Sequence, residues 1–399
     1  MCKITTDGHT YVGNNEDAWG THSRIWFVPG EEKSYGAAYL EHGIGKSIQG
    51  GMNEAGLVFD VFTVQPIDSD SKRFFKDRPS TIMYIMEHCS NVHEVKAYLD
   101  LTDSRYSPIA MFWFIDAQGG SLIMEPDTLI LGNEPYAALV NARPSSYPDY
   151  NQVPVARYHK AMDILNQGPQ GGSEYCANIM ESMSVCRGPL GEGTLYTTIY
   201  DLESKDIHVY FYHDFSTSVT FSLSDELKKG EHEISLPELF PENKEYMALL
   251  DYKTPFNSDF VRVGLIAILL IIILLSLILI SISIFKHVKG TLHNAVSTYL
   301  TLVLIVSLNA LASLHLVILL LREPVFYFGM SGQLANFPFT QVIYGPLIIG
   351  VGSMGLLSWW SFVGSRRQNP VKVELPFKLN IGILCVLSLL NMYWDLMIP

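Results

Sequence analysis

The chain has 399 residues, about the length of two or three domains at ~150 residues each. Its 27 Lys and Arg residues stand against 40 Asp and Glu residues, yet the mean hydropathy is positive. Residues 259–399 hold 8 basic and 4 acidic residues, a net of +4, which leaves 19 and 36, a net of −17, for residues 1–258. This division excludes one homogeneous globule. It also argues against nucleic acid as a partner, because phosphate binding needs a basic surface.

Residues 1–250 carry apolar and β-branched runs between Gly and Pro residues, a pattern typical of short strands. The strand-like runs cover 24–29, 57–64, 108–116, 194–202 and 206–215. Only three residues separate the last two runs, which predicts a hairpin. Helical patterns cover about 80–88, 92–100, 155–166 and 172–184. Because strands and helices do not alternate regularly, we expect an α+β fold rather than a parallel α/β sheet.

The first residues combine a cysteine with a predicted hairpin. Cys2 follows the initiator Met, so removal of Met1 leaves an α-amino group on a cysteine. Such an amine has a pKa of about 8 and can act as a base for its own thiol. The segment TTDGHTYVGNNEDAW predicts a strand, an Asp-Gly turn and a second strand. This hairpin brings Asp17 back toward the N-terminus.

Four further features continue the pattern along the chain. Gly51-Met52-Asn53-Glu54-Ala55-Gly56-Leu57 forms a predicted turn before an apolar strand, and Asn141 ends another strand. Arg157 lies in the helical VARYHKAM, and Thr197-Thr198-Ile199-Tyr200-Asp201 opens the late hairpin. Together with Gly13-Asn14-Asn15-Glu16-Asp17, these segments resemble, in order, the linear-amide hydrolases of the N-terminal-nucleophile class. That class includes choloylglycine hydrolases, penicillin V acylase, acid-ceramidase relatives and isopenicillin acyltransferase.

The resemblance covers roughly residues 1–225 and implies an αββα sandwich with a cysteine nucleophile. It implies that Cys2 attacks an amide carbonyl while its own amine carries the proton, and that Asp17 positions this amine. It further implies that Asn141 donates to the oxyanion and that Arg157 supports the nucleophile. The residues expected at the substrate are Asn14, Asn15 and Thr63. Structural roles stay open for each of these residues: turn caps for Asp17 and Asn15, an Asx-turn for Asn141, and an ion pair for Arg157.

Two departures from the family pattern concern this first segment. Asn14 stands where the family commonly has Arg, and the interval from Cys2 to Asp17 is a few residues shorter than usual. Counting back from Asp17 places the expected nucleophile upstream of Met1. Two hypotheses follow: Cys2 is the nucleophile on a shortened strand, or the precursor starts upstream with a cleaved signal peptide and another cysteine. In the second case Cys2 is structural.

The remaining cysteines do not show a metal-binding pattern. No Cys-x-x-Cys or Cys/His spacing suggests zinc, so we expect neither a metal nor a cofactor. Cys176 and Cys186 form a local disulfide or stay as two free thiols, and both alternatives are open.

Apolar runs dominate after residue 260 and predict an all-α membrane domain of four helices. The spans are expected at about 263–285, 296–321, 337–363 and 379–397. Residues 1–234 would then form the amidase-like domain, 235–259 a linker and 260–399 the membrane domain. Within the spans, Asn309, His315 and Asp395 predict interhelical hydrogen bonds.

Loop charges predict the orientation of this domain. Lys286 and Lys289 follow the first span, and Arg366, Arg367, Lys372 and Lys378 follow the third. Because basic loops stay cytoplasmic, the first 258 residues are expected on the outer, extracytoplasmic side of the bilayer. No signal peptide is recognisable before residue 260, which agrees with an upstream start.

The leading hypothesis is therefore a membrane-anchored cysteine amidohydrolase or acyltransferase that cleaves a linear, non-peptide C–N bond of an N-acyl substrate. Its expected partners are a small N-acyl amide and the lipid bilayer. The alternatives are a hydrolase resembling cysteine dipeptidases and a non-catalytic membrane sensor whose outer domain binds an acyl amide.

Overall fold

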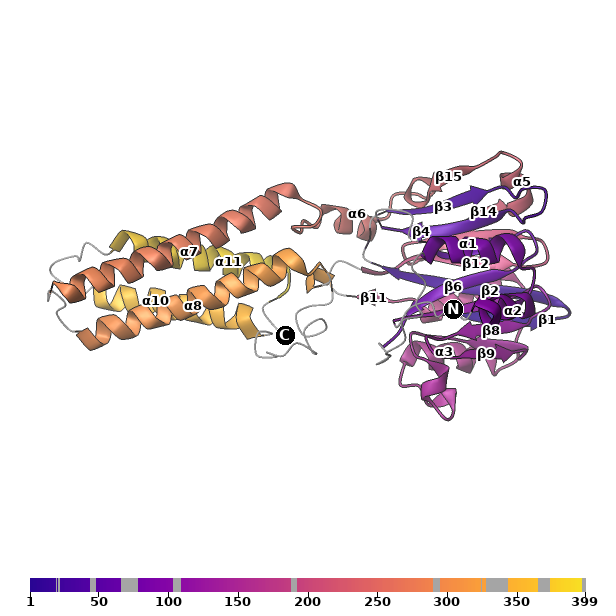
Figure 1. Ribbon diagram of the computed structural model, residues 1–399, viewed down its shortest axis with the longest axis horizontal. Helices are drawn as coiled ribbons and strands as arrows, with labels where there is room; N and C mark the ends of the chain where they lie inside the picture. Colours follow the sequence, from indigo (N-terminus) through magenta and orange to yellow (C-terminus); the bar gives the residue numbers. More distant parts are fainter. Residues whose placement is uncertain are drawn as a thin grey trace. The chain divides into compact units, whose positions relative to one another are not determined.

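The computed structural model describes residues 1–18, 20, 22–43, 48–65, 78–102, 109–187, 192–289, 295–323, 325–327, 344–364 and 374–396. They belong to two compact units, Met1–Asp251 and Tyr252–Pro399. The first unit contains two antiparallel sheets with helices, which confirms the α+β class (Figure 1).

The first sheet contains the N-terminal hairpin and runs in the order β10-β1-β2-β12-β13-β14, with β11 beside β12. Its strands are β1 (Cys2–Thr6), β2 (His9–Ala18), β10 (Tyr136–Ala138), β11 (Cys186–Arg187), β12 (Glu192–Asp201), β13 (Asp206–Phe211) and β14 (Asp214–Ser222). The predicted late hairpin is confirmed, because β12 and β13 pair from Tyr196 and Phe211 to Asp201 and Asp206. Strand β2 joins the two hairpins into one sheet, because it pairs with β1 on one side and with β12 on the other.

The second sheet runs in the order β15-β3-β4-β5-β6-β7-β8-β9, so most neighbours in space are also neighbours in sequence. Its strands are β3 (Ser23–Val28), β4 (Ala37–His42), β5 (Ile48–Asn53), β6 (Val58–Thr63), β7 (Ala110–Ile115), β8 (Ser121–Met124), β9 (Leu129–Gly132) and β15 (His232–Ser235). Antiparallel neighbours of this kind can be joined by short turns, but α1 and α2 lie between β6 and β7 in the chain.

The two sheets face each other through their inner surfaces. Glu16 on β2 reaches His42 on β4, with 3.0 Å between Oε1 and Nε2. Lys3 on β1 donates from Nζ to the carbonyl of Gly119, between β7 and β8. Because alternate strand residues point to opposite sides, the other face of each sheet is left for helices.

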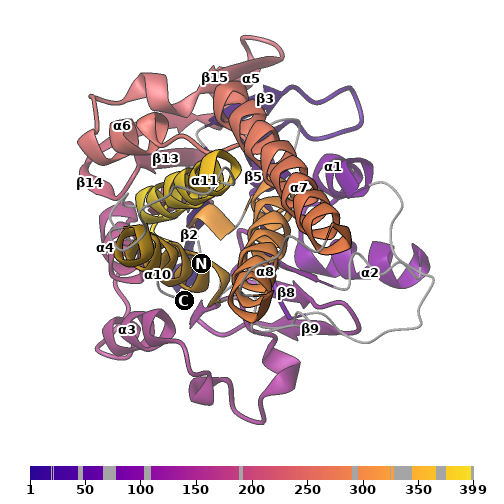
Figure 2. The same cartoon turned by 90° about the vertical axis from the view of Figure 1, so that its left-hand side faces the viewer.

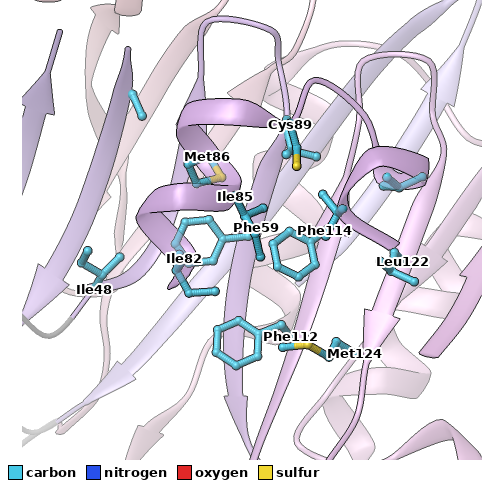
Figure 3. Close-up of a cluster of buried hydrophobic side chains, with 14 of the residues drawn as sticks. Ile48, Phe59, Ile82, Ile85, Met86, Cys89, Phe112, Phe114, Leu122 and Met124 are labelled. Atoms are coloured by element: carbon cyan, nitrogen blue, oxygen red, sulfur yellow. The ribbon is translucent and has the colours of Figure 1, made fainter. Parts of the chain in front are cut away.

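Helices α1 (Arg78–His88) and α2 (Val92–Thr102) cover the outer face of the second sheet. Figure 3 shows Ile82, Ile85 and Met86 of α1 beside Phe59, Phe112 and Phe114 of β6 and β7. Buried apolar side chains of α2 belong to the same cluster. Every residue of β7 is buried, as expected of a central strand with a layer on both faces.

Helices α3 (Ala156–Leu165) and α4 (Ser173–Met183) cover the outer face of the first sheet. Their buried side chains pack against Cys2, Ile4 and Ile199 of β1 and β12. The layers of this unit therefore follow the order helix, sheet, sheet, helix. Two short helices, α5 (Leu223–Leu227) and α6 (Lys244–Asp251), follow β14 and close the unit.

The turn after β5 shows what the Gly51–Leu57 segment does structurally. Asn53 is fully buried, and its Nδ2 donates to the carbonyls of Met86 and Cys89 at the end of α1, both at 2.8 Å. Its Oδ1 accepts from the backbone N–H of Ala55 and Leu57. Asn53 therefore joins the turn to the helix layer, and this is a structural role.

The second unit contains α7 (Asp259–Val288), α8 (Ala295–Leu321), α10 (Gly345–Gly364) and α11 (Glu374–Tyr393). They run side by side, with α7 next to α8 and α11, and α10 next to the same two helices (Figures 1 and 2). Among the described residues, Asp259–Phe285 and Val303–Leu321 are long and apolar enough to cross a membrane. The apolar stretches Gly345–Leu356 and Lys378–Tyr393 are shorter. Residues 337–343 and 397 of the predicted spans lie outside the described part.

Polar side chains in this unit pair across helices. Asn309 on α8 donates from Nδ2 to Ser276 Oγ on α7 at 2.7 Å. His315 on α8 lies 2.7 Å from Asn391 Oδ1 on α11, and both residues are fully buried. The predicted interhelical hydrogen bonds are thus present for Asn309 and His315. Asp395 lies beyond the end of α11, where its backbone N–H donates to the carbonyl of Met392.

Candidate active site

Four residues that the sequence singled out come together from four separate elements. Asp17 lies near the end of β2, Thr63 ends β6, Asn141 follows β10, and Arg157 lies in the first turn of α3. Arg157 stands at the centre of this group, which we call the arginine cluster: Asp17, Thr63, Asn141 and Arg157.

The Arg157 guanidinium bridges the side chains of Asp17 and Asn141. Its Nη1 lies 2.5 Å from Asp17 Oδ2, and its Nη2 donates to Asn141 Oδ1 at 2.6 Å. A planar guanidinium with donors on separate nitrogens suits such a bridge better than an ammonium group. The side chains of Arg157 and Asp17 keep 22% and 20% of their surface exposed, so solvent and small molecules reach the pair.

The remaining contacts orient the carboxylate and the amide. Thr194 on β12 donates from Oγ1 to Asp17 Oδ1 at 2.8 Å. Asn141 Nδ2 donates to the backbone carbonyl of Thr63 at 3.1 Å. Both oxygens of Asp17 are therefore occupied, while the exposed Asn141 amide has a further N–H available. Thr194 was not recognised from the sequence, because its role depends on the pairing of β12 with β2.

The Cys2 thiol lies outside the arginine cluster. Cys2 is fully buried in the apolar layer between the first sheet and α4, and its Sγ is 3.6 Å from Cys176 Sγ. Its cross-strand partner is Gly13, where an added Cβ would meet Cys176 and Met180 on α4. The hydrogen bond with Cys2, together with burial, raises the pKa of the Cys176 thiol well above its usual value. No hydrogen bond joins Cys2 to Asp17, Asn141 or Arg157, all of which are described.

The register of the N-terminal hairpin locates the start of β1 relative to the cluster. Cys2 pairs with Gly13 and Lys3 with Val12, so the numbers of paired residues sum to 15. Met1 therefore stands opposite Asn14, and its amine donates to the carbonyl of Leu139 at 3.2 Å. Asp17 lies beyond the part of β2 that pairs with β1, and its cross-strand partner is Thr194 on β12.

The other residues expected at the substrate have different environments. Asn15 donates to the Met180 carbonyl on α4 and accepts from Thr197 Oγ1 on β12, so it joins three elements. Asn14 is buried, with 5% of its surface exposed. Because successive side chains of a strand point to opposite faces, Asn14 points away from α4, toward the space between the two sheets. Neither side chain takes part in the hydrogen bonds of the arginine cluster.

A buried carboxyl group near the N-terminus was not recognised from the sequence. Asp60 on β6 keeps 3% of its surface exposed, and its Oδ1 has no hydrogen-bond partner among the described residues. Burial, followed by the neighbouring Glu16 carboxyl, raises the pKa of Asp60 well above its usual range. Only the face-to-face packing of β2 and β6 brings these two acids together, and no sequence motif signals it.

The two alternatives for Cys176 and Cys186 were a disulfide and two separate thiols. No disulfide joins Cys176 and Cys186, and Cys176 is buried whereas Cys186 is exposed. The disulfide alternative is therefore wrong for this structure, because Cys176 Sγ faces Cys2 across the sheet–helix interface instead.

Comparisons with known proteins give structural neighbours only. No family model matches the chain, and no curated protein matches its sequence. Among solved structures, penicillin V acylase from Agrobacterium tumefaciens has 16% identity and a TM-score of 0.46 over 59% of this chain and 90% of that one. A variant of conjugated bile acid hydrolase from Clostridium perfringens has 16% identity and a TM-score of 0.45, covering 61% and 98%. An N-acylethanolamine-hydrolyzing acid amidase ortholog from Caenorhabditis elegans has 11% identity and a TM-score of 0.38, covering 50% and 92%.

Proposed function

We propose that the first unit is a cysteine hydrolase or acyltransferase that acts on a linear C–N amide bond. The observation that carries the proposal is the Arg157 bridge between Asp17 and Asn141 beside the start of β1. In one partly exposed cluster, the carboxylate can position an amine and the amide can donate to an oxyanion, two functions that support acyl transfer to a thiol.

The proposed chemistry starts from the α-amino group and the thiol of an N-terminal cysteine. The amine takes the thiol proton, and the thiolate attacks the amide carbonyl to form a tetrahedral oxyanion. Asn141 donates from Nδ2 to this oxyanion, while Arg157 holds the amide in place. The C–N bond breaks as the leaving nitrogen takes the proton, and water or an acceptor amine then releases the acyl group from the thioester.

Two positions for the nucleophile belong to this proposal. Cys2 is the first, and it requires the thiol to leave the apolar contact with Cys176. A cysteine upstream of Met1 is the second. Because Cys2 pairs with Gly13 and not with a residue of the arginine cluster, the second position stays part of the proposal. In that case Cys2 packs against α4 and has a structural role.

A non-catalytic binding unit is the second candidate function. The enclosed Cys2 thiol favours it, because a fully buried sulfur in an apolar layer cannot meet a substrate. Under this alternative, the arginine cluster binds a polar amide or carboxylate ligand, and the helical unit transmits the signal. The two candidates differ in whether product forms.

The second unit is proposed to anchor the enzyme to a bilayer, with the first unit on the extracytoplasmic side. Two of its helical stretches have the length and composition for a membrane crossing. Asn309 and His315 each make one hydrogen bond to a neighbouring helix, although Asn309 Oδ1 and His315 Nδ1 have no partner among the described residues. Anchoring places the site near membrane-derived amides, so lipid-like N-acyl amides belong in the substrate panel.

The test is a product assay on the full chain as the source organism makes it. The first residue of the purified protein is identified by N-terminal sequencing, and the protein is incubated with N-acyl amides and, separately, with dipeptides. We expect amine release from the N-acyl panel, lost in Arg157→Met and after thiol alkylation. Hydrolysis of dipeptides alone would favour the dipeptidase alternative. Ligand binding without product from either panel would support the binding unit and overturn the enzyme.

A further inference from the structure

Three potential metal ligands meet in the first unit, on elements that the arginine cluster does not use. They are Cys186 on β11, His213 in the turn between β13 and β14, and Glu245 in the first turn of α6. One ligand atom from each residue lies within 4.8 Å of the other two. We propose that these residues bind a zinc ion.

The donor set and its spacing fit zinc. Thiolate, imidazole and carboxylate are its usual protein ligands, with bonds of about 2.0–2.3 Å. In a tetrahedral site, such bonds place neighbouring ligand atoms about 3.3–3.6 Å apart. His213 Nδ1 and Glu245 Oε2 already lie 3.3 Å apart. The Cys186 sulfur lies within 4.8 Å of both atoms. Zinc binding would require the exposed Cys186 and Glu245 side chains to rotate until the sulfur reaches the same separation, with a water in the fourth position.

The backbone around His213 is held in an unusual conformation. Tyr212 and His213 form a two-residue turn with φ values of 49° and 64°, a region that favours Gly, Asn and Asp. Strain of this kind at non-glycine residues is concentrated at functional positions. The turn directs the His213 side chain inward, where only 13% of its surface is exposed.

His213 also has unused hydrogen-bonding capacity. Its Nε2 is buried and has no partner among the described residues, whereas Nδ1 faces Glu245. A buried polar atom without a partner typically costs about 1–3 kcal/mol. Coordination of zinc by Nδ1, the nitrogen that faces Glu245, would fix the ring proton on Nε2 and so hold the imidazole in one tautomer.

The position of Glu245 is prepared by the start of α6. Asn243 caps this helix by accepting from the backbone N–H of Glu245 and Tyr246. The same Asn243 donates from Nδ2 to the carbonyl of Tyr212 at 3.1 Å. The helix start and the turn are therefore held together, which keeps Glu245 beside His213. A zinc ion here would clamp α6, the last helix of the first unit, to the β11 and β13–β14 region.

The first measurement is metal affinity of the full chain, extracted in detergent under reducing conditions. Zinc affinity is determined by competition with a chromophoric chelator, and cobalt is used as a spectroscopic substitute. We expect a thiolate-to-cobalt charge-transfer band and saturable binding of one zinc ion. Loss of even an outer partner of a metal site costs about 10–100-fold in affinity. Loss of a ligand in Cys186→Ser, His213→Asn or Glu245→Gln should cost at least as much.

The chain offers a matched control for the histidine change. His232 also lies beside a carboxylate, with 3.0 Å between its Nε2 and Glu226 Oε2. This pair is not part of the cluster of potential metal ligands found among the described residues. His232→Asn should therefore leave zinc affinity unchanged. Asn is chosen at position 213 because it tolerates the left-handed backbone there. Equal zinc affinity in the parent chain, His213→Asn and His232→Asn would overturn the proposal.

A second measurement needs no substitution. Cys186 is exposed, whereas Cys2, Cys89 and Cys176 are buried, so Cys186 should be the most accessible of these thiols to iodoacetamide. We expect zinc to slow its alkylation, read by peptide mass spectrometry, and a chelator to restore the rate. Unchanged alkylation of Cys186 at saturating zinc would contradict the site, whether or not the chain hydrolyses amides.

Discussion

At the scale of single residues, the first unit depends on a few polar side chains that join separate elements. Arg157 uses two nitrogens to hold Asp17 and Asn141, and Asn53 uses all of its capacity to join a turn to α1. Asp60 is the opposite case, a buried carboxyl with an unpartnered oxygen among the described residues. These two kinds of residue lead to opposite expectations for substitution.

Asn141→Ala removes the proposed oxyanion donor. We expect turnover of an N-acyl amide to fall by about 10²–10³-fold, the usual cost of losing one such donor. The KM should change little, because the lost interaction forms mainly in the transition state. Steady-state kinetics decide the matter, with Asn166→Ala at the end of α3 as the control. A large rise in KM at constant turnover would assign Asn141 to substrate binding instead.

Asp60→Asn should stabilise the first unit at neutral pH. The raised pKa means that folded Asp60 holds its proton at pH values where the unfolded chain, near pKa 3.9, has released it. Stability then falls as the pH rises from the unfolded pKa toward the folded one. Each unit of pKa elevation corresponds to about 1.4 kcal/mol at a pH above both values. Urea unfolding from pH 4 to 8 should show this slope in the parent chain and a smaller one in the variant. Identical slopes would contradict the burial argument.

At the scale of elements, the contact between β2 and α4 determines where the N-terminal hairpin lies. Gly13 permits the close approach, because a Cβ there would stand 2.5 Å from Met180 Cγ and 2.9 Å from Cys176 Sγ. Asn15 adds a hydrogen bond to the Met180 carbonyl. The helix layer therefore packs on one face of the hairpin, and this packing places Asp17, near the end of β2, beside Arg157.

Gly13→Ala tests this contact. Overpacking of a well-packed interior costs about 1–3 kcal/mol, so chemical denaturation should show a loss of that size. Adding Met180→Ala creates space for the new methyl group. The double variant should therefore lose less stability than the sum of the two single variants, as expected for residues in contact. Strict additivity would show that β2 and α4 are not tightly packed at this point.

The comparison of sequence with structure follows the same division by scale. The Asp-Gly turn, the late hairpin and the α+β class were predicted from local patterns, because turn chemistry and strand alternation act over a few residues. The grouping of Asp17, Asn141 and Arg157 followed from a family resemblance, and the structure brings these residues together. The enclosed Cys2 thiol depends on which face of β1 meets α4, and no local pattern determines that face. The Cys186, His213 and Glu245 group lies on three separate elements and has no motif spacing.

At the scale of the whole molecule, two units of different composition share one chain. Residues 1–258 carry a net charge of −17, and residues 259–399 carry +4 with long apolar helices. The described structure divides into compact units between Asp251 and Tyr252, close to this change in composition. The predicted linker 235–259 contains the end of β15, α6 and the start of α7, so much of it has regular structure.

Truncation after Asp251 tests this division. The first unit has its own core and should fold alone, with a circular dichroism spectrum of mixed sheet and helix. After cell lysis and alkaline washing, we expect the full chain in the membrane fraction and the truncated chain in the supernatant. A full chain that leaves the membranes under the same wash would contradict the proposed anchor.

The central claim is that an N-terminal cysteine beside the arginine cluster forms an acyl-enzyme. The most direct test is to incubate the full chain, as its source produces it, with a hydrolysed N-acyl amide, quench in acid, and map the acyl group by peptide mass spectrometry. The account predicts an acyl mass on the thiol of the first residue, reduced in Asn141→Ala and Arg157→Met. Continued hydrolysis with no acylated cysteine, or an acyl group on a residue away from the N-terminus, would contradict it.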